Sequence, residues 1–364
     1  MKTEKRKVVL IGTGMVGMSY AYSMLNQNVC DELVLIDIDR KRAEGEAMDL
    51  NHGLAFSGSH MQIYAGDYGD CRDADLVTIC AGVAQKPGES RMDLLKRNRE
   101  VFRSIIGPVV QSGFNGLFLV ATNPVDVMTR ITWELSGFNA RRVIGTGTAL
   151  DTARLRYLLG EHFHVDPRNI HAYVMGEHGD SEFVPWSQAM IATRQIRDIV
   201  REIEAVKGGD AEEARAGGKL TKQAGGQQAE HAGGRLPERD MQQAETGTQS
   251  SQMEQLARIS EEVRGAAYRI IEAKRATYYG IGMAMTRITK AILGDENSVL
   301  TVSALLCGEY GQHGVFVGVP AIINQNGVQR ILTLNLTEEE QEKLEDSCRI
   351  LQESFRGLVQ EAAS

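Results

Sequence analysis

Short apolar runs recur through the first 150 residues, separated by stretches long enough to form helices. Valine, isoleucine and leucine dominate these runs, and none alternates strictly between polar and apolar positions. Strands that are buried on both faces of a parallel sheet have this composition. The runs span residues 7–12, 32–37, 75–82, 116–122 and 142–147. This pattern predicts an α/β fold, with a doubly wound parallel sheet and its crossover helices in residues 1–150.

The pattern changes at residue 151 to longer helices with a few strands, which predicts a second, α+β domain over residues 151–364. Residues 153–163 are typical of an amphipathic helix, and residues 260–293 supply one or two more. Residues 314–332 contain two strand-like runs near the dipeptide Asn326-Gly327, which indicates a hairpin.

A last helix is predicted from Thr337 onward, because Glu340 follows three residues later and completes a capping box. Apolar residues then recur at spacings of three and four, as on the buried face of a helix packed on the core. They are Leu344, Cys348, Leu351, Phe355 and Leu358.

Residues 208–252 depart from this pattern. They contain no aromatic residue and only three large apolar ones, and Gly-Gly pairs begin at 208, 217, 225 and 233. Such a segment buries too little apolar surface to offset the entropy of ordering it. We expect a low-complexity insertion that is disordered or weakly helical; an inert surface extension is the alternative reading.

Composition narrows the class of protein. The 364 residues are 42% hydrophobic and 24% charged, and a formal charge of -8 without a basic cluster argues against a nucleic-acid partner. The five cysteines never form a CxxC pair, which favours free cytosolic thiols over disulfides or a zinc site, and no metal is expected. No apolar run approaches the length of a membrane span, and the basic N-terminus leads straight into a strand pattern. These features predict a soluble cytoplasmic protein with no membrane partner.

A glycine motif stands between the first strand and the first helix, Gly12-Thr13-Gly14-Met15-Val16-Gly17. In a Rossmann domain, its first glycine permits a tight turn, its second lets the backbone approach a pyrophosphate, and its third lets the helix pack on the strand. Asp37 ends the second strand, where an acidic side chain binds the ribose hydroxyls and repels a 2′-phosphate. The motif therefore predicts NAD rather than NADP; a different nucleotide is the alternative.

Four further motifs follow in order: AGVAQKPGESR at 81–91, ATNPVD at 121–126, LDTARLR at 150–156 and GEHGDS at 176–181. With these motifs the chain resembles the lactate/malate dehydrogenase family over almost its whole length outside 195–255. The resemblance implies hydride transfer between NAD and a small 2-hydroxy acid. A non-catalytic NAD-binding protein is a remote alternative.

The resemblance assigns roles to four charged residues. His178 is the expected acid/base, since an imidazole pKa near 6.5 suits proton exchange at neutral pH. Asp151 is its carboxylate partner, with a helix N-cap as the alternative role. Arg154 binds the substrate carboxylate through its planar fork, and Arg91, on a mobile loop, closes over the carbonyl oxygen.

The resemblance also implies cofactor and substrate contacts. Met15 and Val16 of the glycine motif join Gly82, Thr122, Asn123 and Ile281 at the cofactor. Asn123 and Thr277 are expected at the substrate as well, although Thr277 and Ile281 also suit ordinary helix packing.

Gln85 is the position that distinguishes substrates. Relatives that act on malate carry an arginine here, which pairs with the second carboxylate. A neutral glutamine leaves that carboxylate without a counter-ion, and Glu89 adds negative charge to the same loop. The resemblance therefore predicts interconversion of L-lactate and pyruvate. Malate or a bulkier 2-hydroxy acid is the alternative substrate.

Arg156 and His171 match positions at which bacterial members of the family bind fructose 1,6-bisphosphate across a subunit interface. Cationic donors suit a phosphate site, and the alternative is an ordinary surface role for both residues. A homotetramer is expected from the resemblance.

Overall fold

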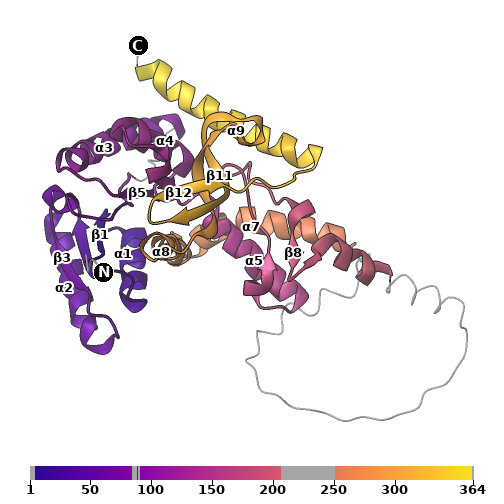
Figure 1. Ribbon diagram of the computed structural model, residues 1–364, viewed down its shortest axis with the longest axis horizontal. Helices are drawn as coiled ribbons and strands as arrows, with labels where there is room; N and C mark the ends of the chain where they lie inside the picture. The colour runs from indigo at the N-terminus through magenta and orange to yellow at the C-terminus, as the bar shows by residue number, and fades with distance from the viewer. Residues whose placement is uncertain (1–4, 84–87, 89–90, 206–250, 363–364) are drawn as a thin grey trace, which may run out of the picture.

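The computed structural model describes residues 5–83, 88, 91–205 and 251–362 (Figure 1). Gln85 lies outside the described residues. So does the 208–252 insertion, except for Ser251 and Gln252, which begin a helix.

One nine-stranded sheet runs through the molecule in the order β12-β11-β10-β6-β5-β4-β1-β2-β3. Its strands are β1 (Lys7–Ile11), β2 (Glu32–Ile36), β3 (Gln62–Ala65), β4 (Leu76–Ile79), β5 (Leu117–Val120), β6 (Val143–Gly145), β10 (Ser298–Cys307), β11 (His313–Asn324) and β12 (Gly327–Ile331). The first six are parallel. Every residue of β1, β4, β5 and β6 is buried, which explains why their sequences do not alternate.

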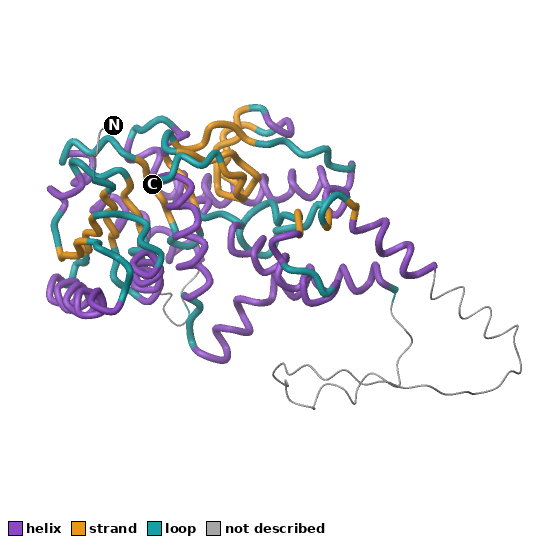
Figure 2. The backbone as a smooth tube through the Cα atoms, turned by 60° about the horizontal axis from the view of Figure 1, so that its bottom comes forward, coloured by secondary structure: helices purple, strands orange, loops and turns teal. Residues whose placement is uncertain are grey.

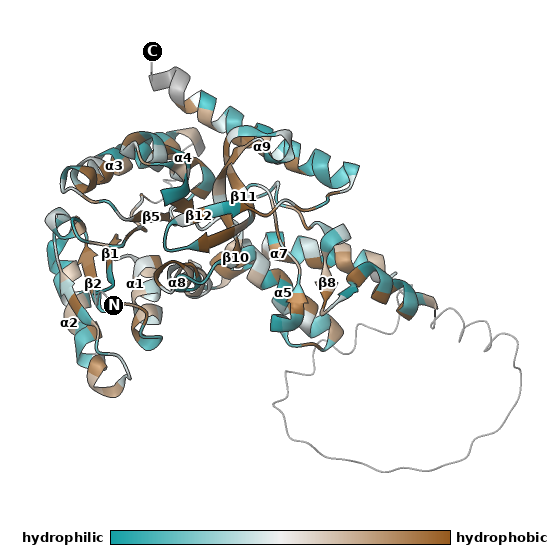
Figure 3. Ribbon diagram, viewed as in Figure 1, coloured by the Kyte–Doolittle hydropathy of each residue, from teal (hydrophilic) through white to brown (hydrophobic). Residues whose placement is uncertain are grey.

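The eight helices with assigned bounds are α1 (Met15–Asn26), α2 (Arg40–Gly53), α3 (Arg91–Gln111), α4 (Val125–Ser136), α5 (Ala149–Phe163), α7 (Gln252–Lys274), α8 (Tyr279–Leu293) and α9 (Glu338–Ala362). Long helices surround the strands (Figure 2). The strands β1, β2 and β5 are hydrophobic, whereas much of α2 and α9 is hydrophilic (Figure 3). This arrangement confirms the predicted α/β class.

The hairpin β11–β12 and the strand β10 extend the sheet in the antiparallel sense. Ser303 of β10 pairs with Gly145 of β6, so the second half of the chain continues the sheet built by the first. Asn324 pairs with Gly327 across the turn, and the predicted hairpin is confirmed. The proposed domain boundary at residue 150 stays a prediction.

Helices α1 and α8 lie side by side at one face of the sheet (Figure 1). The hydroxyls of Tyr20 and Thr289 lie 2.8 Å apart in this buried contact. A side chain at Gly282 would place its Cβ 2.8 Å from the backbone of Ser19, so only glycine permits this close approach. The contact fixes the start of α8 beside the glycine motif.

A second, smaller core lies beside the sheet. It joins α5 and α7 to the helix at 196–205 and to a three-stranded sheet of β7 (Ile170–His171), β8 (Met190–Ile191) and β9 (Arg194–Gln195). Leu155, Ile196 and Leu256 are among its buried members. The predicted helix at 153–163 lies within α5, and the helical pattern at 260–293 forms two helices that part at Arg275, where φ is 73°.

Helix α9 runs over β11 and past α3 and α4. All five residues of its predicted apolar face are buried. The capping box is present: the N–H of Thr337 donates to the Glu340 carboxylate over 3.0 Å, and the N–H of Glu340 donates to the Thr337 hydroxyl over 3.3 Å.

Two further findings concern the chain as a whole. All five cysteines are free, as expected. In the described part of the chain, no helix has both the length and the apolar character needed to cross a membrane.

We predict that Glu340→Ala lowers the free energy of unfolding by about 1–3 kcal/mol, because its carboxylate is buried and also accepts from the N–H of Ser187 over 2.9 Å. Burial opposes the charged form, but these bonds prevail and lower the pKa of Glu340. A lowered carboxyl pKa contributes stability that is lost as the pH falls through it. In chemical denaturation at decreasing pH, the free energies of unfolding of the wild type and of Glu340→Ala should therefore become equal.

Glu339→Ala is the matched control, because Glu339 is 77% exposed and pairs only with Lys343 among the described residues. It should not change the unfolding midpoint measurably. Equal losses in both variants would contradict the role given to Glu340.

Candidate active site

The glycine motif connects β1 to α1 and packs tightly on its inner side. Gly12 has a φ of 101°, and a Cβ there would lie 2.5 Å from the backbone nitrogen of Ala81. A Cβ on Gly17 would lie 2.1 Å from the carbonyl oxygen of Gly12. Both positions therefore require glycine, the first for its turn and close approach and the third for helix packing.

The outer side of the motif is open. A Cβ on Gly14 would have no heavy atom within 4 Å, and Gly14 is the N-cap of α1. The first turn of α1 carries no acidic residue, and Met15 is 61% exposed. Free N–H groups and the positive end of the helix dipole thus face an open space that suits a pyrophosphate.

Asp37 follows β2 and faces this motif. Its carboxylate accepts from the N–H and the hydroxyl of Thr13 over 2.7 and 2.9 Å, and from the N–H of Asp39 over 3.0 Å. Burial disfavours the charged form, but these bonds outweigh it and lower the pKa of Asp37. An ionised acceptor at the ends of β1 and β2 fits the ribose of NAD.

The loops after β4 and β5 lie along the same edge of the sheet. The Thr122 hydroxyl donates to the carbonyl of Ala81 over 2.7 Å, and a Cβ on Gly82 would lie 2.7 Å from Thr122. Asn98, which is 2% exposed, accepts from the N–H of Val83 and donates to the carbonyl of Asn123 over 3.4 Å. Asn98 therefore ties together the two loops, a function that sequence analysis missed.

Asp151 lies in the first turn of α5, directly after the last parallel strand, and its side chain is 3% exposed. One carboxylate oxygen lies 2.6 Å from Nδ1 of His178, and the other accepts from Nη1 of Arg154 over 2.7 Å. The alternative role of Asp151 as an N-cap is wrong, because Thr148 occupies that position. The three residues expected to act together are thus in direct contact.

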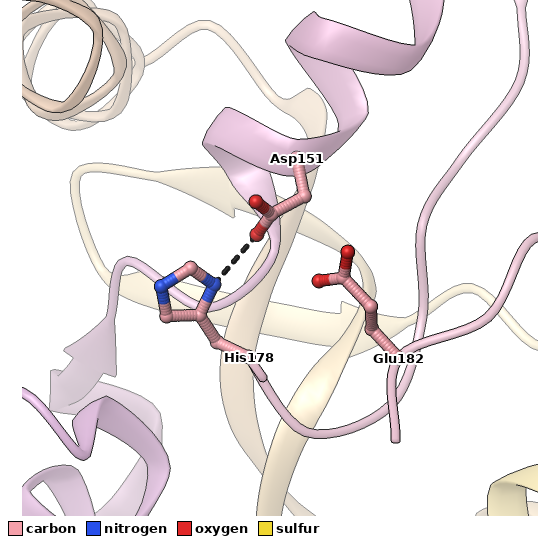
Figure 4. Close-up of side chains that lie close together, drawn as sticks. All are labelled: Asp151, His178 and Glu182. Atoms are coloured by element: carbon pink, nitrogen blue, oxygen red, sulfur yellow. Dashed lines mark hydrogen bonds and ion pairs between the residues drawn. The ribbon is translucent and has the colours of Figure 1, made fainter. Parts of the chain in front are cut away.

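The loop that carries His178 is held from three sides. The N–H of His178 donates to the Asp126 carboxylate of α4 over 2.9 Å. Gly176 exchanges two 3.0 Å backbone bonds with Gly318 of β11. The N–H of Glu177 donates to the Ser347 hydroxyl of α9 over 2.7 Å. These contacts fix the imidazole, and the ring nitrogen that does not face Asp151 lies on the opposite side of the ring (Figure 4).

The surrounding charges keep this imidazole protonated. Burial disfavours the imidazolium, but the charge and hydrogen bond of Asp151 prevail, with further support from Glu182 and Asp126, and raise the pKa of His178 to about 9. Burial also raises the pKa of Asp151, but His178 and Arg154 outweigh it and the net shift is downward. At neutral pH the pair is therefore an imidazolium against a carboxylate, ready to donate a proton.

Two buried carboxylates near His178 were not predicted from the sequence. Asp126 is 2% exposed, and burial raises its pKa to about 6. Glu182 is 5% exposed, and burial together with the charge of Asp151 raises its pKa to about 8. The acidic position in ATNPVD was the available signal for Asp126; Glu182 follows GEHGDS directly and had none.

One ligand atom each from Asp151, His178 and Glu182 lie within 4.8 Å of one another, a spacing that a metal ion can bridge. The guanidinium of Arg154 already balances Asp151, and Nδ1 of His178 already bonds to it. The set therefore suits a proton-carrying pair better than a cation site.

The remaining residues that the sequence predicted for the site come from other elements of the fold. Thr277 lies in the loop before α8 and Ile281 in its first turn, and both are half-buried. Arg91 is the first residue of α3. Arg156 donates to the carbonyl of Ala172 over 3.0 Å, next to the exposed His171 at the end of β7.

Two family models match this chain. The model described as lactate/malate dehydrogenase, NAD binding domain, matches residues 6–145. The model described as lactate/malate dehydrogenase, alpha/beta C-terminal domain, matches residues 148–223 and 228–361. The two models together cover most of the chain.

Individual proteins are similar to this chain over its full length. L-lactate dehydrogenase 2 of Bacillus anthracis is 48% identical over 359 residues, which cover 99% of this chain and 100% of that protein. The crystal structure of a lactate dehydrogenase from a Medee basin deep-sea metagenome library has a TM-score of 0.83 at 46% identity, and covers 98% of this chain and 100% of its own. The crystal structure of the minor L-lactate dehydrogenase of Enterococcus mundtii in its ligands-bound form has a TM-score of 0.82 at 42% identity. The match covers 97% of this chain and 98% of that chain. The chain therefore belongs to the lactate/malate dehydrogenase family, on its L-lactate dehydrogenase branch, and its first domain binds NAD.

Proposed function

We propose that this chain interconverts pyruvate and L-lactate, with His178 as the general acid and base. The single observation that supports this most is the buried contact of His178, Asp151 and Arg154 at the start of α5. This contact supports the roles of His178 as proton donor and of Arg154 as the cation that binds the substrate carboxylate. The full-length likeness to proteins named L-lactate dehydrogenase supports the choice of substrate.

The residues divide the work of pyruvate reduction. Arg154 uses one N–H on Asp151 and has further donors for the substrate carboxylate. The protonated His178 donates from its free ring nitrogen to the carbonyl oxygen, while Asp151 stabilises the imidazolium before transfer. We propose that Arg91 closes over that oxygen. Asn123, Thr277 and Ile281 would line the substrate and nicotinamide site. NADH, held by the glycine motif and Asp37, would supply the hydride for the carbonyl carbon.

The cofactor contacts are assigned along the carboxyl edge of the sheet. Gly12, Gly14 and Gly17 with Met15 and Val16 form the pyrophosphate side, and Asp37 binds the ribose. Gly82 and Thr122 continue this edge toward His178. The open space at Gly14 and the lowered pKa of Asp37 support this assignment.

We also propose a homotetramer with a phosphate-binding site at Arg156 and His171. Exposed apolar side chains on adjacent helices support contact between copies, including Tyr22 of α1 at 62% and Met283 of α8 at 56% exposure. The Arg156 guanidinium is oriented by the Ala172 carbonyl and lies over the Tyr173 ring at 5.2 Å.

We expect purified protein with NADH to reduce pyruvate far faster than oxaloacetate. Gln85→Arg should raise the ratio of kcat/KM for oxaloacetate to that for pyruvate by 100-fold or more, on the order of the several kcal/mol that an unpaired carboxylate costs. Stopped-flow measurement of NADH consumption on both substrates gives the ratio. A wild-type preference for oxaloacetate would overturn the lactate assignment, and an unchanged ratio in the variant would remove Gln85 from it.

Asp151→Asn should move the pH dependence of pyruvate reduction downward by about 1–3 units. The active form carries a protonated His178, so activity is present at low pH and falls as the pH rises through its pKa, about 9 in the wild type. Removing the carboxylate lowers that pKa and shifts the fall to lower pH. Asp166→Asn, which removes an exposed carboxylate paired with Arg168, is the control and should keep the wild-type profile. A profile that does not move in Asp151→Asn contradicts the pairing.

Fructose 1,6-bisphosphate should lower the KM for pyruvate or shift the protein toward the tetramer in analytical ultracentrifugation. The double variant Arg156→Gln, His171→Gln should lose this response and keep activity without the effector. If the wild type shows no change in saturation curve or in assembly, the phosphate site is refuted.

A further inference from the structure

Glu182 is a buried carboxylate for which the proposed reaction has no role so far. Its backbone N–H donates to the carbonyl of Gly179 over 3.3 Å, and its own carbonyl accepts from Arg264 over 3.2 Å. In the part of the chain that the structure describes, no hydrogen bond reaches its carboxylate. That group instead faces Asp151 and His178 (Figure 4).

A carboxylate on a residue that is only 5% exposed is costly unless neighbouring charges stabilise it. The charged groups around it come from three elements. Asp151 and Arg154 face it from α5, His178 from the loop after β7, and Arg264 from α7. Arg264 is exposed and contacts the backbone of Glu182, whereas the side chains of Arg154 and His178 are only 14% and 24% exposed and are the shielded cations beside the carboxylate.

The geometry assigns to Glu182 the role of a second carboxylate that holds the proton on His178. Asp151 bonds directly to the imidazole, and Glu182 places a second carboxyl group within 4.8 Å, which is negatively charged in the pH range where His178 titrates. Asp126 faces the same residue from α4, through its bond to the backbone N–H. Glu182 is thus a positioning residue, because it acts through the His178–Asp151 pair. This role rests on the proposed function, which requires a protonated His178 for pyruvate reduction.

The coupling works in both directions. The imidazolium favours an ionised Glu182, and an ionised Glu182 favours the imidazolium. When His178 has given up its proton, Asp151 and Glu182 face each other as two carboxylates, and their repulsion draws a proton back to the site. The raised pKa values of His178 and Glu182 agree with this exchange. Asp126 also favours the imidazolium from α4, and Arg264 favours the charged form of Glu182 from α7.

The test replaces Glu182 by its neutral isostere, Glu182→Gln, and follows His178 directly. Selective 13C labelling of histidine gives one imidazole signal for each of the eight histidines, and the signal absent from His178→Asn identifies His178. We expect its pKa in the free protein to fall by about one unit or more, because a charge at this distance is removed from a buried site. The high-pH loss of pyruvate reduction should move down by the same amount.

Asp180→Asn is the matched control, since it removes one carboxylate from the same loop at an exposed position. Its His178 signal should titrate as in the wild type. Glu182→Asp keeps the charge and should restore most of the wild-type pKa. Glu182→Ser removes the charge with a smaller side chain and gives a second measurement if the glutamine variant does not fold.

The proposal is overturned if His178 titrates unchanged in Glu182→Gln or Glu182→Ser, or if Asp180→Asn shifts it equally. The NMR titration needs no turnover. A wild type that fails to reduce pyruvate would refute the proposed function while the titration still decides the role of Glu182.

Discussion

The buried contact between Asp151 and His178 is the constraint on which the site depends. A carboxylate that is 3% exposed is tolerable only with cations beside it, and His178 and Arg154 are those cations, at 2.6 and 2.7 Å. The two partners come from distant parts of the chain. Asp151 follows the last parallel strand, whereas the loop of His178 is held by α4, β11 and α9. The parallel sheet, its antiparallel extension and the terminal helix therefore all contribute to one short hydrogen bond.

Burial of the Asp151–His178 contact costs free energy, and it also sets the protonation state that proton transfer requires. An imidazole in water is mostly neutral at neutral pH, and a neutral imidazole is a poor donor to a carbonyl oxygen. Here the charge and hydrogen bond of Asp151 outweigh the loss of solvent and raise the pKa of His178, and Glu182 and Asp126 add to this effect when they are ionised. The protonated His178 is then a proton donor next to Arg154. Arg154 uses one N–H on Asp151, and its other N–H groups can bind a substrate carboxylate. Under the proposed function, this charge balance suits the anionic form of a 2-keto acid.

Much of the fold could be predicted from the sequence, because its strands, helix ends and glycine motif depend on neighbouring residues along the chain. Apolar runs located β1, β2, β4, β5 and β6, the capping box located α9, and the glycine motif located the cofactor edge. The strand β3 was missed, since it has four residues with only Ile63 fully buried and lies at the sheet edge. Asn98 and Glu182 were missed for another reason. Each is an ordinary polar residue in sequence, and only tertiary burial against loops from elsewhere gives it a partner or a charge to act on.

The position of the 208–252 insertion explains how the fold accepts it. The described chain stops at residue 205 and resumes at 251, and the elements on both sides share the smaller core, where Ile196 and Leu256 are both buried. Because the ends are held together by that core, the entropy of closing a loop between them rises only slowly with its length. The contacts that fix His178 come from α4, β11 and α9, none of which adjoins the insertion. Helix α7 begins at Gln252 and reaches the backbone of Glu182 through Arg264, and the helix at 196–205 reaches α9 through the ion pair of Arg197 and Glu340 over 3.7 Å. Both elements that flank the insertion therefore contact parts of the fold that support the active site, α7 at the backbone of Glu182 and the helix at 196–205 at α9.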